Sequence, residues 1–259
     1  MAYAWVLWFS FRRYSAYRLA ALGEAVSNTV FGFVRGYVLL ALWQATPGLG
    51  GYTATDAITF SFLTQAMIGP VQIFGGMELT QRIRTGDVSI DLHRPADLQL
   101  WWLADDLGRA LYTVIGRGTI PMFAGWLAFG ILFPPAERWP AFLLSLLLAV
   151  VLGFSIRYVI SILVFWLTDS RALDSVAIVC SLFLSGMILP LVAFPGPFQT
   201  AVRALPWSGL IQVPADVYLG RSPDLLGSFA FQAGWAAVLL LAGRLLTRAA
   251  HRKLVIQGG

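Results

Sequence analysis

The segment Glu78–Asp106, ELTQRIRTGDVSIDLHRPADLQLWWLADD, decides the fold, because it is a dense block of charge between two stretches apolar enough to cross a bilayer. The whole chain is 58% hydrophobic and only 12% charged, and its mean hydropathy is +0.73. Soluble domains carry roughly 25% charged residues. The composition therefore requires a membrane, and the charged block is expected to lie in water between two spans.

Six apolar stretches are long enough to cross the hydrocarbon core, which takes about 20 helical residues. They are Ala21–Trp43, Thr55–Met77, Leu107–Phe133, Ala141–Leu167, Ala172–Phe194 and Leu226–Leu246. The sequence thus predicts an all-α polytopic membrane protein with one domain over residues 1–259. Its expected parts are a leading helix (1–20), spans one and two (21–77), the charged segment (78–106), spans three to five (107–194), an outer segment (195–225), and span six with the tail (226–259).

Basic residues indicate the orientation of these spans. They gather before span one, between spans two and three, and after span six, at Arg12, Arg13, Arg18, Arg82, Arg84, Arg94, Arg248, Arg252 and Lys253. By the positive-inside rule, the charged segment and both termini are expected in the cytoplasm, with the chain in the cell membrane. The net charge of +5 suits an anionic inner leaflet. Basic residues spread over membrane loops are poor evidence for nucleic-acid binding, which we discount.

Residues 1–20 carry their positive charges after the apolar run Ala4–Phe11, whereas a signal peptide carries them before it. Trp5, Trp8 and Phe9 are interleaved with arginines, which predicts an amphipathic helix along the inner membrane surface. A frayed extension of span one is the alternative.

Scarce residue types exclude several chemistries. Cys180 is the single cysteine, so no disulfide framework or thiolate metal cluster forms within one chain. His93 and His251 both fall in cytoplasmic segments, where they cannot serve an intramembrane Ser-His pair. The single lysine, Lys253, is followed by leucine and follows no glycine-rich turn. A phosphate-binding loop is therefore absent, and any nucleotide hydrolysis must come from another polypeptide.

Polar side chains inside spans are costly and are functional candidates by default. The candidates here are Glu24, Arg35, Gln65, Arg117 and Arg157. One acid cannot neutralise three arginines, so some arginines are expected to face a polar cavity, a partner subunit or lipid phosphate. The alternative is that Arg117 or Arg157 pins two helices together or reaches the interface.

The outer segment after span five is too apolar for a solvated loop and too rich in proline for one spanning helix. Pro195, Pro206, Trp207 and Pro214 mark its breaks. Two short helices dipping into the outer leaflet are expected.

A resemblance to a known family rests on two groups of residues. The series Ser185-Gly186, Pro190, Phe194-Pro195, Leu205-Pro206, Pro214 and Tyr218-Leu219-Gly220 resembles the fifth span and re-entrant outer helices of ABC-2 type transporter permeases. The run Arg82-Ile83-Arg84-Thr85-Gly86-Asp87, followed by Asp91-Leu92-His93-Arg94-Pro95, is similar to a branch of small six-span permeases that pair with a separate ATPase and often with a second related permease. The resemblance covers essentially the whole chain.

The resemblance implies a role for each region. Residues 83–98 would form the coupling helix that docks on the ATPase, residues 1–20 the connecting helix, and residues 198–218, with the proline breaks, the external gate. Docking contacts would come from Arg82, Arg84, Asp87, Asp91, Leu92, Arg94 and Pro95, with Pro95 starting the next helix. The turn at residues 168–174 would be a second contact, and His93 stands where an aliphatic residue is expected.

The chain would then be the permease subunit of an ATP-driven exporter of apolar or amphiphilic compounds. It would itself be no enzyme and hold no cofactor, because ATP and magnesium would lie on two copies of the partner ATPase. A second permease, identical or homologous, would complete the assembly.

Two other classes stay open. One is a membrane enzyme acting on lipid or isoprenoid phosphates through a metal held by Asp87 and Asp91, with Asp97, Asp105 and Asp106 nearby. The other is an assembly or sensor subunit without transport activity.

Overall fold

A computed structural model of the chain describes residues 2–167 and 171–257. All regular elements in these two ranges are helical. The first half contains α1 (Ala2–Ser15), α2 (Arg18–Ala45), α3 (Ala54–Val71), α4 (Glu78–Thr85), α5 (Val88–Leu92), α6 (Leu98–Thr113), the π turn η2 (Val114–Gly118) and α7 (Thr119–Phe129). The second half contains α8 (Trp139–Leu163), α9 (Arg171–Leu184), α10 (Gly196–Ala204), α11 (Gln212–Leu219) and α12 (Leu225–Gln257), with the 3₁₀ turns η4 (Leu191–Ala193) and η5 (Pro206–Gly209) around α10.

Three helices of the described part are long and apolar enough to cross a membrane: Arg18–Ala45, Ala136–Leu163 and Leu225–Ala250. Ala172–Leu184 is a shorter apolar helix. The chain is therefore an all-helical protein with membrane-spanning capacity, and the arrangement as six spans stays a prediction from the sequence.

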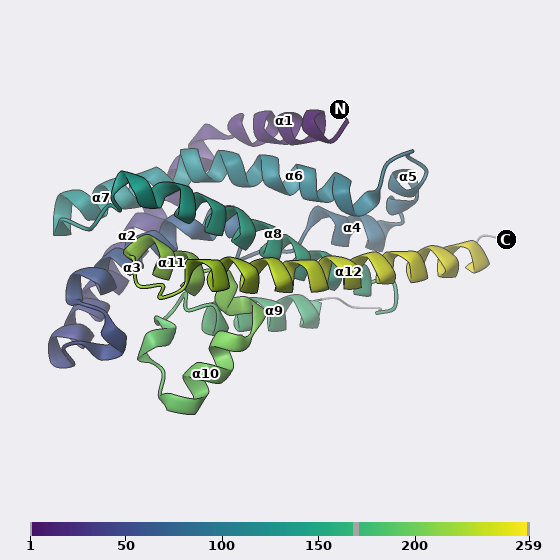
Figure 1. The fold of residues 1–259 in the computed structure, drawn as a ribbon. Coiled ribbons are helices and arrows are strands. Elements are labelled where there is room, and N and C mark those ends of the chain that lie inside the picture. The colour runs from purple at the N-terminus through teal and green to yellow at the C-terminus, as the bar shows by residue number, and fades with distance from the viewer. Residues whose placement is uncertain (1, 168–170, 258–259) are drawn as a thin grey trace.

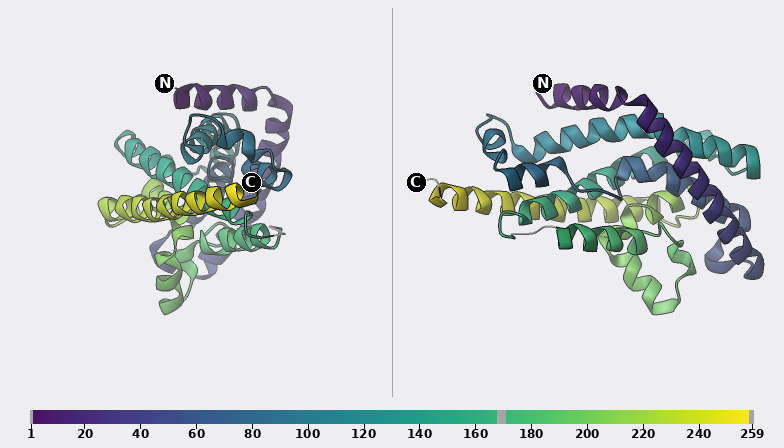
Figure 2. Two further views of the ribbon diagram at one scale, coloured as in Figure 1. Left: turned by 90° about the vertical axis from the view of Figure 1, so that its right-hand side faces the viewer. Right: turned by 180° about the vertical axis from the view of Figure 1, so that it is seen from behind.

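Most helices run along one long axis of the molecule (Figure 1). α12 packs along α8, α2 along α3, and α1 along α6. The two chain ends lie toward the same end of the molecule as α4 and α5, and α10 projects sideways from the bundle (Figures 1 and 2).

Two apolar clusters hold the bundle together. The larger one is centred on aromatic and aliphatic side chains of α2, α3, α8 and α11, including Trp43, Phe60, Phe62, Leu152 and Ile211. The smaller one lies beneath α4 and α5 and includes Leu79, Val88, Phe154, Tyr158 and Ile162. The short α4–α5 segment is thus packed onto α8 by its own buried apolar residues.

Two expected spans end earlier than the sequence suggested. The expected span to Met77 stops at Val71, because Pro70 cannot continue the hydrogen-bond ladder and Gln72 adopts a left-handed conformation with φ of 55°. The expected span to Phe194 stops as a helix at Leu184, shortly before Gly186 (φ of 88°) and Pro190. Both predicted ends were wrong.

The third expected span is longer and irregular. α6 begins at Leu98, where the Asp97 carboxylate accepts a hydrogen bond from the Leu100 N–H at 2.9 Å. Pro95 therefore does not start the helix, and that prediction was wrong, because the aspartate supplies the N-terminal cap two residues later. The helix then passes through the π turn η2 before continuing as α7.

Candidate functional site

The expected coupling segment folds as two short helices joined at Gly86. Gly86 has a φ of 84°, a left-handed conformation that favours glycine, and it ends α4. The Thr85 hydroxyl donates to the Asp87 carboxylate at 2.7 Å and fixes the turn. The resemblance implied a coupling helix within residues 83–98, and the regular helix there is confined to the end of α4 and to α5, with a non-helical stretch leading to Leu98.

Three of the expected docking residues bond to one another, and of these Asp91 is buried while Arg94 stays exposed. The Asp91 side chain is 4% exposed and accepts two hydrogen bonds from Arg82, at 2.6 and 3.1 Å. Arg94 approaches the same carboxylate at 3.2 Å, and its guanidinium lies over the Trp101 ring, 4.8 Å from the centroid. This Arg82–Asp91–Arg94 triad fixes α5 on α4 and α6.

The opposite side of the α4–α5 segment faces outward. Arg84, Asp87, His93 and Pro95 are exposed, and Ile90 is a large apolar residue that is 59% exposed. Leu92 is half-buried. Leu79 is fully buried, and the hydroxyls of Thr80 and Ser161 lie 2.8 Å apart, which ties α4 to α8. The segment therefore presents an exposed face on a base that is fixed to the membrane bundle.

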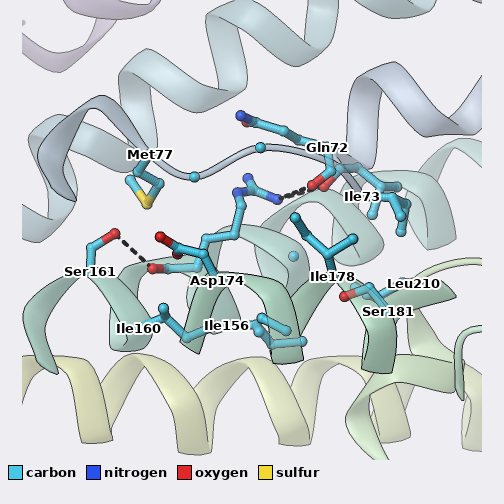
Figure 3. Close-up of a pocket in the computed structure, with 16 residues that line it drawn as sticks. Gln72, Ile73, Met77, Ile156, Ile160, Ser161, Asp174, Ile178, Ser181 and Leu210 are labelled. Carbon is cyan, nitrogen blue, oxygen red and sulfur yellow. Dashed lines mark hydrogen bonds between the residues drawn. The ribbon is translucent and has the colours of Figure 1, made fainter. Parts of the chain in front are cut away.

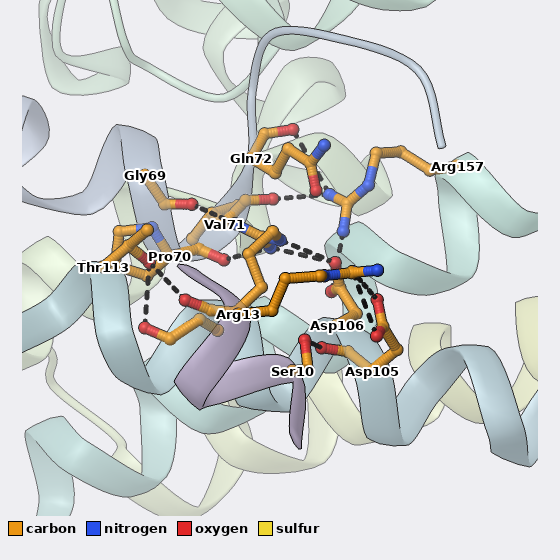
Figure 4. Close-up of polar contacts among 12 residues, drawn as sticks. Ser10, Arg13, Gly69, Pro70, Val71, Gln72, Asp105, Asp106, Thr113 and Arg157 are labelled. Carbon is orange, nitrogen blue, oxygen red and sulfur yellow. Dashed lines mark hydrogen bonds and ion pairs between the residues drawn. The ribbon is translucent and has the colours of Figure 1, made fainter. Parts of the chain in front are cut away.

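A buried ion cluster lies where α3 ends (Figure 4). The Asp106 carboxylate accepts from Arg109 Nε at 3.0 Å and from Arg157 Nη2 at 2.8 Å. Arg109 also donates to the carbonyl oxygens of Gly69 and Pro70, and Arg157 to those of Val71 and Gln72 at 2.6 and 3.2 Å. We call Asp106, Arg109 and Arg157 the inner clamp.

The inner clamp satisfies the carbonyls that a helix leaves without intrahelical partners at its C-terminus. Two positive guanidiniums are also favourable at the negative end of the helix dipole. Because the arginines come from α6 and α8, the clamp joins three helices at one point. Directly after that point the chain enters the linker to α4.

The neighbouring Asp105 faces the other way, toward α1. Its carboxylate pairs with Arg13 at 3.1 Å, and its carbonyl accepts from the Ser10 hydroxyl at 2.7 Å. Burial raises the pKa of Asp105, and the charge of Arg13 opposes this rise. At Gly108, an added Cβ would lie 2.2 Å from the Leu7 carbonyl oxygen. α1 is thus closely packed on α6, and the exposed Trp5, Trp8 and Phe9 lie on its free surface.

The arginines that the sequence analysis expected within the spans have specific partners. Arg117 of η2 pairs with Glu24 of α2. Arg35 donates to the Thr64 hydroxyl at 2.8 Å and to the carbonyl oxygens of Met187 and Ile188, which follow α9. Gln65 is buried in α3. The partner of Arg157 is Asp106, an acid that the sequence analysis assigned to the charged segment, so the comparison of one acid with three arginines left out this carboxylate.

A small cavity of about 30 Å³ adjoins the inner clamp (Figure 3). It lies between the linker after α3, α8 and α9, and Arg157, Asp174, Ser161 and Ser181 are among its walls. The volume suits about two water molecules. Asp174 belongs to the expected second cytoplasmic contact at residues 168–174, of which residues 168–170 lie outside the described part of the chain.

The end of the molecule expected to face outward contains two buried aspartates that the sequence analysis did not single out, Asp216 and Asp56. Asp216 of α11 accepts from the Tyr52 hydroxyl and from the Gln212 amide at 2.8 Å, and Arg203 lies 3.3 Å from it. Burial raises the pKa of Asp216, and Arg203 opposes the rise. Nearby, Asp56 caps α3 together with Thr53 and pairs with Arg221.

The expected gate residues border this outer network. Pro195 precedes α10, Pro206 begins η5 with Trp207 beside it, and Pro214 lies in the first turn of α11. Short helices therefore occupy this segment, as the prolines predicted. Whether they dip into the outer leaflet stays a prediction.

The aspartates that suggested a metal site are dispersed. Asp87 bonds to Thr85, Asp91 to Arg82 and Arg94, and Asp97 to Arg244 at 2.9 Å. Asp105 and Asp106 face different helices. Among the described residues, no three histidine, cysteine or acidic side chains gather to hold a metal ion.

Comparison with known proteins gives one match. A sequence model of the family described as "ABC-2 family transporter protein" matches residues 31–258, nearly the whole chain. Searches of curated proteins and of solved structures gave no match.

Proposed function

The chain belongs to the ABC-2 transporter family, and from that premise we propose that it is the membrane-spanning permease subunit of an ATP-driven exporter in the cell membrane. ATP and magnesium would be held by two copies of a separate ATPase subunit. A second permease, identical or homologous, would complete the transport path. Both chain termini would face the cytoplasm, and the exported compound would be apolar or amphiphilic.

The observation that carries the proposal is the division of the α4–α5 segment into a fixed base and an exposed face. Leu79, the Thr80–Ser161 contact and the Arg82–Asp91–Arg94 triad fix the base. The exposed face offers the apolar Ile90 beside Arg84 and Asp87. A central apolar residue with a charged rim is typical of a protein-docking surface.

The inner clamp gives this docking a mechanical consequence. Closure of the two ATPase subunits would move α4 and α5 as one body, because the triad and the buried apolar residues oppose bending within the segment. The clamp would pass that movement to α3, α6 and α8 together, as in other rigid-body transitions. The outer ends of these helices would then separate from a second permease and open the path outward.

The test is co-purification of the ATPase with tagged protein from its native membrane. An Arg84→Glu, Ile90→Asp double variant changes only exposed side chains, so we expect about a tenfold or greater loss of bound ATPase with unchanged folding. Thr200→Glu, an exposed position on α10, is the matched control and should retain the ATPase. Asp91 is unsuitable for this test because it is buried in the triad.

Two results would contradict the proposal. One is the absence of any ATPase in gently solubilised, folded wild-type protein. The other is full retention of the ATPase by the double variant, which would place the docking surface elsewhere.

A further inference from the structure

A second cavity, of about 350 Å³, lies between α3, the π turn η2, α8 and α11. We call it the apolar cavity. Its walls include Leu63, Met67, Val114, Met122, Phe142 and Leu146. It is the size of the smaller ligand pockets in proteins.

The two hydroxyl groups in the walls of the apolar cavity already donate hydrogen bonds within the protein. Thr119 and Tyr218 are wall residues with hydroxyl groups, and these donate to the carbonyl oxygens of Ile115 at 3.0 Å and Leu132 at 3.1 Å. Neither hydroxyl has a proton left for a ligand. Most of the lining side chains are hydrocarbon, so a hydrocarbon occupant fits this space better than water does.

The rim of the apolar cavity is aromatic and exposed. Phe123 is 59%, Phe133 48% and Trp139 36% exposed. Trp139 begins α8, which belongs to one of the helices able to cross a membrane. Aromatic residues in this position are typical of the membrane–water boundary. The opening thus faces the bilayer near its surface, where lipid acyl chains are the abundant hydrocarbon.

We propose that the apolar cavity binds one acyl chain of a bilayer phospholipid. The driving force is packing, because an empty space of this size deprives every wall side chain of contacts on one side. Hydrophobic transfer contributes little here, since the acyl chain leaves one apolar medium, the bilayer, for another.

An acyl chain at this site would contact a residue that the inner clamp holds. Pro70 lines the apolar cavity, and its carbonyl oxygen accepts a hydrogen bond from Arg109 at 3.0 Å. Because proline has no N–H, the carbonyl of Ala66 lacks its helical donor. Gly118 allows the π turn to approach that carbonyl, since a Cβ there would lie only 3.1 Å from it. The bound chain would therefore hold the weakest turn of α3 against η2.

Photolabelling in nanodiscs tests this proposal. The full-length protein is placed in phosphatidylcholine containing a small share of lipid with a diazirine in the middle of one acyl chain. After irradiation, adducts are mapped by mass spectrometry. We expect labels on Met122 and Leu146 well above those on Leu241, which is 60% exposed on α12.

Two filling variants place a ring in the cavity from different wall positions, Thr119→Phe and Val114→Phe. Each variant should lower the labelling of Leu146 about tenfold. The loss of binding free energy that corresponds to this factor lies within the usual cost of overpacking. Leu144→Phe, on the exposed face of α8 outside the cavity, is the matched control and should leave it unchanged.

Labels at Met122 and Leu146 that are no stronger than the label at Leu241 would overturn the proposal. The same result is expected if a second protein chain fills the cavity instead of lipid. Equal labelling in both filling variants and the control would overturn it as well. The assay needs no ATPase, so its outcome is independent of the proposed transport function.

Discussion

Asp106 and Asp216 are both 6% exposed, yet their surroundings differ in kind. Asp106, at the inner end of α3, accepts hydrogen bonds only from the guanidiniums of Arg109 and Arg157, whose side chains are 8% and 10% exposed. Asp216, at the outer end, accepts mainly from the neutral groups of Tyr52 and Gln212. Its one cation, Arg203, is 38% exposed.

The difference indicates which end of the molecule is fixed and which can rearrange. At the inner end, a charge lost from the carboxylate leaves two cations buried without compensation. At the outer end, Arg203 is 38% exposed and can turn into water, and the other partners of Asp216 carry no charge. The inner end therefore suits the transmission of force, and the outer end suits opening.

The largest expected effect is that of Asp106→Asn. The substitution keeps the shape of the side chain but leaves Arg109 and Arg157 without a counter-charge, which should cost about 3–5 kcal/mol of the free energy of unfolding. Denaturant titration in mild-detergent micelles measures this quantity. An effect no larger than that of Asp216→Asn would break the contrast between the two ends.

A second test changes the close contact between α8 and the backbone of α3 beside the inner clamp. A Cβ at Gly153 would lie 2.8 Å from the Val71 carbonyl oxygen and 3.2 Å from Arg157 Nη1. Gly153→Ala should therefore destabilise by about 1–3 kcal/mol. Gly234→Ala in α12 has open space around it and is the matched control, expected to be neutral or stabilising by up to about 1 kcal/mol. Equal effects at the two glycines would show that the helices do not depend on this contact.

The outer network should respond more weakly. Asp216→Asn retains an acceptor for Tyr52 and Gln212 and loses mainly the attraction of the half-exposed Arg203. We expect a destabilisation of about 1 kcal/mol in the same titration. A loss comparable to that of Asp106→Asn would mean that Arg203 cannot turn outward.

The smallest effect is a pH dependence at the outer end. Burial raises the pKa of Asp216, so the folded protein holds this proton more firmly than the unfolded chain does. The contribution to stability is complete below the unfolded pKa of about 3.9 and is lost as the pH rises through the raised folded value. As the pH rises across this window, the thermal midpoint of unfolding of the wild type should fall by more than that of Asp216→Asn. Identical pH profiles would contradict this role of Asp216.

The sequence predicted the helical class, the membrane, and the charged α4–α5 region, because composition and local charge density carry that information directly. It also predicted the short helices of the outer segment from its apolar composition and its prolines. These features depend on neighbours in the chain, and Pro195, Pro206 and Pro214 act within one or two turns.

The sequence allowed for Arg157 joining two helices, but it missed the acid of the inner clamp, because the partner depends on the direction in which each side of a helix faces. Asp105 and Asp106 are adjacent in the sequence, but consecutive helical residues point in directions about 100° apart, so one faces α1 and the other faces α3 and α8. Counting Asp106 with the cytoplasmic acids hid the partner of Arg157. The same holds for Asp91, whose charge suggested docking although it is buried.

Arg35 is synthesised well before one of its hydrogen-bond partners. Its carbonyl partner Met187 lies 152 residues later in the chain. At synthesis rates of 5–20 residues per second, that partner emerges roughly 8–30 s after Arg35. Until then an arginine in the middle of α2 costs about 2.5–3.5 kcal/mol in the bilayer. Until the region after α9 has been made, the apolar residues of α2 must therefore offset this cost without the Met187 contact.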